Sequence, residues 1–357
     1  MSRDARSDPT NRHPTARRGP MRTTPSARPS ARRAAPPEAR PSARGDGLVV
    51  GTIPAGARVA GALLVLAALA GAAAAFPTYL VVGGQQLALA EGFGSALVAL
   101  LVPVVNLAVG VVLLRGAVPK FGLGYAGVAG ALGLGLLMIE IYRGRSSTER
   151  PGVEVLAGER VLTSGVEAGP GWVLGVIALA LTVLAGVVAI AAWGRTVMED
   201  GGALDPLRSG LAGAAVLLGV TTVLSLSIPA ADVPDQLVTD PATGLEIVVT
   251  QEGPQALLER PGLALMGGLL LAGAVMLCSV IAPSLRPRLA AVGGLLAVAV
   301  AVLSAALTGL RDAVASDELD WTVPGAGLLV AGLGFALLTV LAWRLRRSPP
   351  VIRSGAA

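Results

Sequence analysis

Eight apolar stretches of roughly 20 residues follow one another along this 357-residue chain, and no other feature constrains its fold as strongly. A helix needs about 20 apolar residues to cross the hydrocarbon core of a bilayer. The stretches lie at about 59–81, 95–115, 121–142, 172–194, 210–229, 262–283, 289–310 and 325–345. They predict an all-α integral membrane protein with eight transmembrane helices in contact with the lipid bilayer.

The composition supports this class and excludes several kinds of chemistry. Hydrophobic residues make up 53% of the chain, charged residues only 14%, and the mean hydropathy is +0.70; soluble domains have about 25% charged residues. The single cysteine, Cys278, excludes an intramolecular disulfide and a cysteine-cluster metal site. The only histidine, His13, lies in a polar segment. We therefore expect no enzyme activity, no catalytic residues, no cofactor and no bound metal.

The N-terminal region, residues 1–56, is predicted to be a disordered cytoplasmic tail. It is rich in Arg, Pro and Ala and lacks apolar periodicity, so no core can form there. Residues 1–48 contain eleven arginines and four acidic residues. Attraction to anionic lipid head groups is a second possible role for this tail. Nucleic acid is not an expected partner, because no aromatic residue interleaves the arginines. Residues 347–357 form a short basic cytoplasmic tail.

The arginine distribution predicts the orientation of the spans. With both termini in the cytoplasm, 22 of the 28 basic residues but only 7 of the 23 acidic residues lie on the inner side. This is the bias that the positive-inside rule describes. Trp172 and Trp321 then lie at the outer boundary, and Trp193 and Trp343 at the inner one. The expected location is the plasma membrane, and 27 arginines against one lysine favour a bacterial source.

Internal repetition predicts two parallel four-helix repeats, residues 57–200 and 201–346. At an offset of 152, Phe76-Pro77 matches Ile228-Pro229. At an offset of 168, Pro119-Lys120 matches Pro287-Arg288. Because each repeat has four spans, both copies would insert with the same orientation. Low-complexity helices can also produce such matches by chance.

The two long outer loops are the predicted places for strands. Val153 to Leu156 can pair with Arg160 to Thr163 around Ala157-Gly158, and Leu245 to Thr250 is a second β-branched run.

Five polar residues are the candidate intramembrane sites: Asn106, Glu140, Thr221, Thr222 and Ser225. Polar groups within the membrane often mark substrate pathways. Each also has a structural interpretation: an interhelical hydrogen bond for Asn106, an ion pair with Arg143 for Glu140, and bonds to the helix backbone for the hydroxyls.

Small residues recur at helical spacing in two spans and predict close helix contacts. The glycines of span 121–142 form the first set, and Ala301, Ala305 and Gly309 form the second.

These features favour a non-catalytic partner or scaffold protein of the cell envelope, with a protein partner in the membrane. The alternative is a transporter or channel for a small or lipid-like substrate that uses the cleft between the repeats. A scaffold should show its polar groups paired between helices and no cavity. A transporter should show a cleft between the two halves, with Asn106 and the hydroxyls of span 210–229 facing it.

Overall fold

The computed structural model describes residues 49–145, 153–156, 159–162, 165–199, 207–234, 236–239, 246–249, 256–257, 259–316 and 319–344. All of them belong to a unit of residues 45–357. Most of the predicted N-terminal tail and all of the predicted C-terminal tail lie outside the described residues.

Eight helices of the described chain are long and apolar enough to cross a membrane, which confirms the predicted number of apolar helices and supports a multi-pass membrane protein. They are α1 (Ala55–Ala74), α2 (Phe93–Arg115), α3 (Pro119–Arg143), α4 (Pro170–Trp193), α5 (Arg208–Leu226), α6 (Leu263–Ser284), α7 (Arg288–Ala315) and α8 (Val323–Arg344).

Local sequence explains where these helices begin and end. Pro119 and Pro170 occupy the first positions of α3 and α4, where a missing N–H costs nothing. Gly116 ends α2 with a positive φ of 68°. Helix α1 ends at Ala74 and not near residue 81, because Pro77 interrupts the backbone and the chain continues as a strand.

Short antiparallel strands join the loops at both ends of the helices. At one end, β1 (Val49–Val50) pairs with β7 (Met198–Glu199). At the other end, β2 (Leu80–Val82) lies between β3 (Gln85–Leu87) and β6 (Val166–Ala168), and β8 (Ala231–Asp232) pairs with β11 (Asp320–Trp321). We call these the β1 end and the β2 end.

The two long loops each contain a pair of antiparallel strands; a hairpin was predicted in the first loop and only a single strand in the second. Strand β4 (Val153–Leu156) pairs with β5 (Glu159–Leu162), one residue from the expected position. Strand β9 (Gln236–Thr239) pairs with β10 (Glu246–Val249), which coincides with the predicted β-branched run. The turn residues Ala157 and Gly158 lie outside the described residues.

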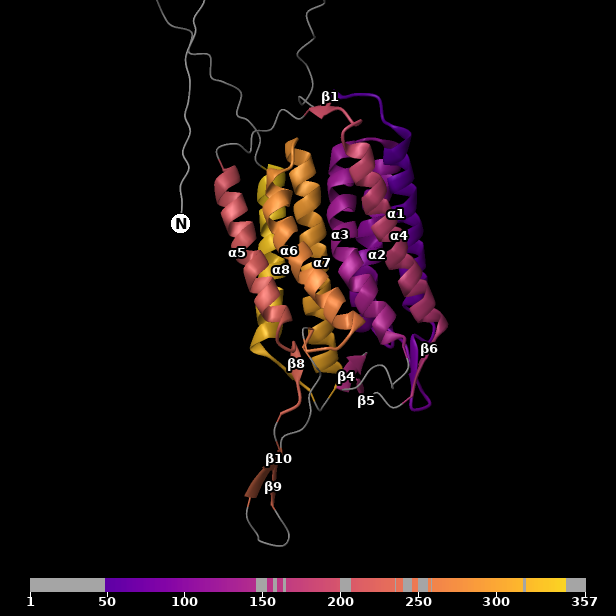
Figure 1. Cartoon of the computed structure of the whole chain (residues 1–357), viewed down its shortest axis with the longest axis vertical. Helices are drawn as coiled ribbons and strands as arrows, with labels where there is room; N and C mark the ends of the chain where they lie inside the picture. Colours follow the sequence, from indigo (N-terminus) through magenta and orange to yellow (C-terminus); the bar gives the residue numbers. More distant parts are fainter. Residues whose placement is uncertain are drawn as a thin grey trace, which may run out of the picture. The chain divides into compact units, whose positions relative to one another are not determined.

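The helices pack as two groups that meet at α3 and α7 (Figure 1). In the first group, α1 packs against α2 and α4, and α3 packs against α4. In the second group, α5 packs against α6 and α8, and α7 packs against α8. Between the groups, α3 contacts both α7 and α6, and α2 makes a smaller contact with α7.

Glycines let α3 approach its neighbours closely, as its sequence predicted. A Cβ atom at Gly130 would lie 2.7 Å from the Cα of Gly186 in α4. A Cβ atom at Gly135 would lie 2.7 Å from the carbonyl oxygen of Gly267 in α6. Such contacts replace bulky packing where lipid supplies no hydrophobic driving force between helices.

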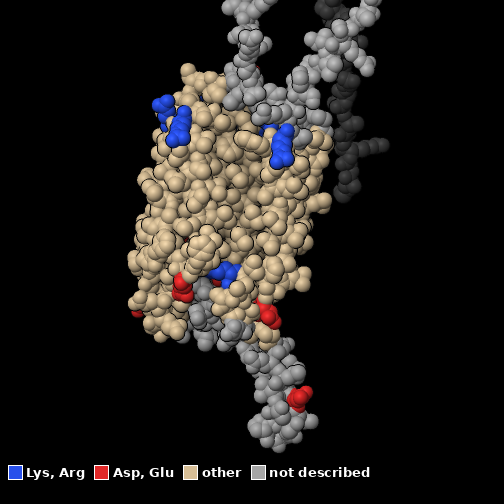
Figure 2. Space-filling view, turned by 180° about the vertical axis from the view of Figure 1, so that it is seen from behind, with Lys and Arg blue, Asp and Glu red and all other residues tan. Residues whose placement is uncertain are grey.

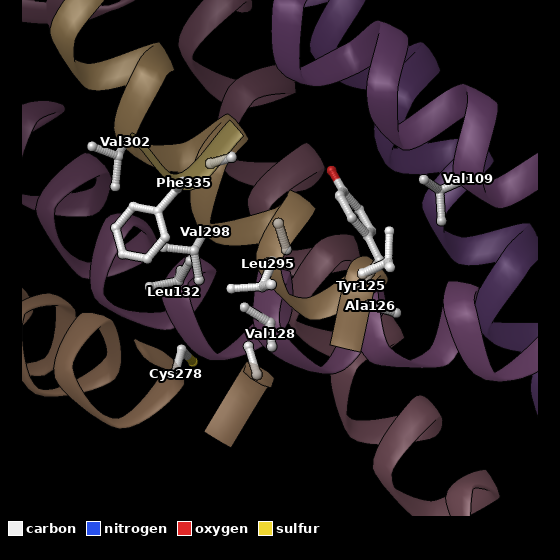
Figure 3. Close-up of a cluster of buried hydrophobic side chains, with 14 of the residues drawn as sticks. Val109, Tyr125, Ala126, Val128, Leu132, Cys278, Leu295, Val298, Val302 and Phe335 are labelled. Carbon is white, nitrogen blue, oxygen red and sulfur yellow. The ribbon is translucent and has the colours of Figure 1, made fainter. Parts of the chain in front are cut away.

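The core consists of apolar side chains between the helices, and the outside is also apolar. Figure 3 shows part of the core, with Leu132 of α3, Val298 of α7 and Phe335 of α8 in one cluster. Large apolar side chains such as Leu217 and Ile190 are exposed on the outside. Charged side chains on the face in Figure 2 lie near the two ends, with a broad uncharged zone between them. This zone is the surface that a bilayer would cover.

Candidate functional site

A cavity of about 410 Å³ lies between the two helix groups. Its walls come from α2, α3 and α4 of the first group and from α5, α6, α7 and α8 of the second, with the segments 228–231 and 256–260 at the β2 end. Most wall side chains are apolar or small, among them Val102, Ala129, Leu132, Leu136, Leu179, Leu271, Ala297, Ala301, Ala305 and Leu328.

The cavity forms because α3 and α7 touch near the β1 end and leave space toward the β2 end. A Cβ atom at Gly124 would lie 2.5 Å from the carbonyl oxygen of Ala290, and one at Gly293 would overlap the carbonyl oxygen of Phe121. The wall residues of α3 begin at Tyr125, directly after this contact. The described wall residues of α3 therefore all lie on the β2 side of this contact.

The small residues Ala301, Ala305 and Gly309, predicted to make close helix contacts, lie beside the cavity, and Ala301 also packs against the buried core. All three residues line the cavity. A Cβ atom at Gly309 would lie 2.9 Å from the Cβ atom of Ala230, in the segment after α5, and within 4 Å it would meet no described atom of another helix. Their small side chains leave room in the wall of α7, whereas the glycines of α3 bring helices together.

Asn106 is buried in α2 and lines the cavity. Its side-chain oxygen accepts a hydrogen bond of 2.7 Å from the hydroxyl of Tyr125 in α3. The residue thus makes the interhelical bond that was one of its two expected roles, and it also faces the space between the groups. The neighbouring wall residue Thr182 donates to the carbonyl oxygen of Ala178 in its own helix.

The three hydroxyl residues of α5 lie in different surroundings. Thr221 is exposed and Thr222 is buried, and both donate to backbone carbonyl oxygens four residues earlier. Neither lines the cavity. Ser225 does line it. The cavity therefore brings together Asn106 and Ser225 of the five candidates.

Glu140 lies near the β2 end of α3, only 8% exposed, and three other residues contact it. The hydroxyl of Tyr79 donates to Oε1 at 2.7 Å, and Arg143 donates to Oε2 at 3.2 Å, which confirms the expected ion pair. The indole of Trp172 donates to the backbone oxygen of Glu140 at 2.8 Å. These bonds tie the segment after α1 and the start of α4 to the end of α3.

The environment of Tyr79 raises the pKa of its hydroxyl well above the ordinary value. Burial is the largest cause, because it disfavours the charged phenolate. The nearby Glu140 carboxylate also raises the pKa, while Arg143 partly opposes the shift. Tyr79 therefore remains a hydrogen-bond donor to Glu140 into the alkaline range.

Charged wall residues occur where the cavity reaches the β2 end. Arg143 comes from the end of α3, Arg260 from the segment before α6, and Asp312 from the last turns of α7. Asp312 accepts hydrogen bonds from the guanidinium of Arg311 next to it. We call Arg143, Arg260 and Asp312 the cavity mouth.

Sequence reasoning missed several of these residues. Arg260 lies between two predicted spans, and its sequence neighbours give no sign of a site. Tyr79 had no signal in the sequence, since its bond with Glu140 joins residues 61 positions apart. Within the described residues, no three His, Cys, Asp or Glu side chains are grouped so that they could hold a metal ion.

The chain gives no match to the protein families, curated proteins or solved structures with which it was compared. The cavity and its mouth are therefore the observations on which a function can be argued.

Proposed function

We propose that this protein is a transporter-class membrane protein that binds an apolar or lipid-like molecule in the cavity between its two helix groups. The cavity of about 410 Å³ is the observation that carries this proposal. Binding sites for small molecules have volumes of about 300–1,000 Å³ and are mostly apolar. An apolar substrate also needs none of the paired carboxylates that ion-coupled transport uses within a membrane.

The chemistry of the wall supports an apolar ligand. Away from the mouth, the wall residues that the structure describes include no charged side chain. Four polar wall residues, Asn106, Tyr125, Thr182 and Thr308, already have hydrogen-bond partners within the protein, so a ligand need not supply theirs. The pairing of Asn106 with Tyr125 also fits the scaffold hypothesis, but the cavity does not.

We also propose that the two helix groups are parallel repeats, α1–α4 and α5–α8. Each contact between two helices of the first group has a counterpart in the second. The contact of α1 with α4 corresponds to that of α5 with α8, and the contact of α1 with α2 corresponds to that of α5 with α6. The contact of α3 with α4 corresponds to that of α7 with α8. The contacts between the groups are also reciprocal: α3 of the first group contacts α6 of the second, and α7 of the second group contacts α2 of the first. Such reciprocity is expected for two copies related by a pseudo-two-fold axis along the membrane normal.

Details at the helix ends support the repeat. Strand β8 pairs with β11 as β2 pairs with β6. Gly171 and Gly325 each follow a proline. A Cβ atom added to Gly171 would lie 3.1 Å from the carbonyl oxygen of Thr78, and one added to Gly325 would lie 2.6 Å from the carbonyl oxygen of Ala230. Those two residues are 152 positions apart, the offset predicted for this part of the chain.

A second correspondence lies at the β1 end. Lys120 at the start of α3 is 5.3 Å from the ring centre of Trp193, the last residue of α4. Arg288 at the start of α7 donates to the backbone oxygens of Ala342 and Trp343 near the end of α8. In both groups a cation therefore lies at the C-terminus of the fourth helix, where it interacts favourably with the helix dipole.

For orientation, we propose that the β1 end faces the cytoplasm of a bacterial cell and that both termini lie there, with the protein in the plasma membrane. Arg115, Lys120, Arg195 and Arg208 support this, since all four lie in or beside the loops of that end. The cavity mouth then opens toward the outer side.

Filling the cavity tests the proposed function. Ala305→Phe places a large ring in the wall of α7, and Ala191→Phe places the same ring on the exposed surface of α4 as a matched control. Each variant is purified in mild detergent, and native mass spectrometry measures the lipid or small molecule that stays bound. We expect retention by Ala305→Phe to fall at least several-fold, with retention by Ala191→Phe unchanged.

Equal retention by both variants would contradict binding in the cavity. A stoichiometric protein partner on a wild-type chain that carries no small molecule would instead favour the envelope scaffold.

A further inference from the structure

The side-chain amide of Asn106 keeps part of its hydrogen-bonding capacity inside the cavity. Its oxygen accepts the bond from Tyr125, but within the described part of the chain no acceptor bonds its two N–H groups. Asn106 is only 4% exposed, and it lines the cavity. We propose that this amide donates a hydrogen bond to an uncharged carbonyl oxygen of the ligand. Asn106 then selects a lipid-like molecule that carries an ester or ketone group over a pure hydrocarbon.

This inference rests on the proposed function and adds the polar group of the ligand and the residue that recognises it. The amide nitrogen of Asn106 is not among the described side-chain atoms that are both sealed from contact and without a partner. It therefore has accessible surface, although the residue as a whole is buried. The cavity is the space that this residue lines, so a ligand there can reach the nitrogen.

Small residues leave room beside the hydrogen-bonded pair of Asn106 and Tyr125. The wall residue Ala129 follows Tyr125 one turn later on the same face of α3. On α7, a Cβ atom at Gly293 would lie 3.1 Å from the backbone nitrogen of Tyr125, and the wall residue Ala297 follows one turn later. These short side chains provide the space that a carbonyl group needs near the pair.

The depth of Asn106 in the bilayer favours an uncharged acceptor. With a rise of 1.5 Å per residue, it lies about 14 Å from Arg115 and about 20 Å from Phe93 along α2. A donor without an acceptor is unfavourable in such apolar surroundings, so a ligand that supplies one binds more tightly. A carboxylate or phosphate would instead lose its hydration there. An ester or ketone oxygen accepts the bond without carrying a charge.

Two probes with the same number of chain atoms, methyl palmitate and octadecane, test the inference. The full-length protein in mild detergent receives equal amounts of both, and native mass spectrometry counts each retained probe. Asn106→Leu replaces the amide with an apolar side chain of similar size. We expect the ratio of retained ester to retained hydrocarbon to be roughly fivefold higher in the wild type, the factor for one ordinary hydrogen bond.

Thr182→Val is the matched control, because it removes a wall hydroxyl that already donates to Ala178. Its ratio should equal that of the wild type. Since Asn106→Leu also leaves the hydroxyl of Tyr125 without its acceptor, the comparison is repeated in Tyr125→Phe. The ratio should stay high in Tyr125→Phe and fall when Asn106→Leu is added.

Infrared spectroscopy detects the proposed bond directly. An isotope label at the carbonyl carbon of methyl palmitate separates its band from those of the protein. The band of the bound ester should lie at a lower wavenumber in the wild type than in Asn106→Leu, because an accepted hydrogen bond weakens the C=O bond.

Equal probe ratios or equal band positions in the wild type and Asn106→Leu would overturn the role of Asn106 while leaving binding in the cavity intact. An equal fall of the ratio in Thr182→Val would also overturn it, since any change in the wall would then have the same effect. A wild type that retains neither probe, and no other small molecule, would overturn the proposed function itself.

Discussion

At the scale of single residues, Glu140 illustrates how a carboxylate near a membrane is stabilised. A buried charge is costly unless it is paired and hydrogen-bonded. Here Tyr79 and Arg143 each bond one of its oxygens, and Trp172 bonds its backbone. Because these partners come from the segment after α1, from α3 and from α4, the cluster also fixes how three elements meet at the β2 end.

The raised pKa of Tyr79 predicts how stability depends on pH. Its neutral form is favoured in the folded protein, so its contribution is fully present below the ordinary tyrosine pKa of about 10. That contribution is lost progressively as the pH rises above this value, because only the unfolded chain then readily forms phenolate. We expect the melting temperature of the wild type to fall more steeply than that of Tyr79→Phe between about pH 9.5 and pH 11.5, from roughly half a unit below to one and a half units above that pKa.

Thermal unfolding in detergent, followed by tryptophan fluorescence, measures this difference. Parallel pH profiles for the wild type and Tyr79→Phe would contradict the assignment.

Part of this residue-level arrangement could be predicted from the sequence. Glu140 and Arg143 are three positions apart, a spacing that places them on one face of a helix. The hydroxyls of Thr221 and Thr222 likewise bond to their own helix, as local chemistry allows. The bond between Tyr79 and Glu140 could not be predicted, because it depends on how α1 and α3 pack.

At the scale of elements, α3 is the helix that connects the two groups. It contacts α4, α6 and α7, and at each contact a glycine brings another backbone close. The contact with α7 involves Gly124 on one side and Gly293 on the other. A methyl group at either position would have to push against backbone, which cannot move as a side chain can.

Gly293→Ala is therefore expected to destabilise the protein by about 1–3 kcal/mol, the usual cost of overpacking. The matched control is Gly213→Ala in α5, an exposed position where a Cβ atom would meet nothing within 4 Å. There alanine should be neutral or stabilise the helix by up to about 1 kcal/mol, because it loses less backbone entropy than glycine. Unfolding in mixed detergent micelles measures both, and equal stabilities would show that α3 and α7 do not approach as described.

Most element boundaries followed from the apolar pattern, and the exceptions have physical causes. Hydropathy extended the first span to residue 81, but Pro77 ends helical structure before the apolar run ends. The opposite error occurred in α7, which continues to Ala315 although Arg311 and Asp312 ended the predicted span. Those two side chains bond to each other, so the helix can carry them beyond the apolar run.

At the scale of the whole molecule, the cavity is the feature that the sequence could not provide. Ala301 and Ala305 have the same small-residue pattern as the contact glycines of α3, yet they line empty space. A pattern of small residues shows where a large side chain is missing. It does not show whether a neighbouring helix or a cavity occupies that side, because this depends on the relative positions of all eight helices.

The proposed orientation predicts which loops are accessible from outside the cell. A cysteine replacing Gln85, which is exposed in β3, should react with a membrane-impermeant maleimide in intact cells. A cysteine replacing Arg195, exposed after α4, should react only after permeabilisation. The native Cys278 is buried and should contribute little background. Labelling of Arg195→Cys alone in intact cells would require the inverted orientation.

The charged side chains near the helix ends affect how the protein responds to the membrane potential. Every charged side chain in the eight described helices, from Arg58 in α1 to Arg344 in α8, lies within about one or two turns of a helix end. Moving one elementary charge across the full membrane potential involves about 2.3 kcal/mol per 100 mV. A rearrangement of these helices would move no charge through most of that field. The arrangement of these helices should therefore respond hardly at all to the electrical state of the membrane.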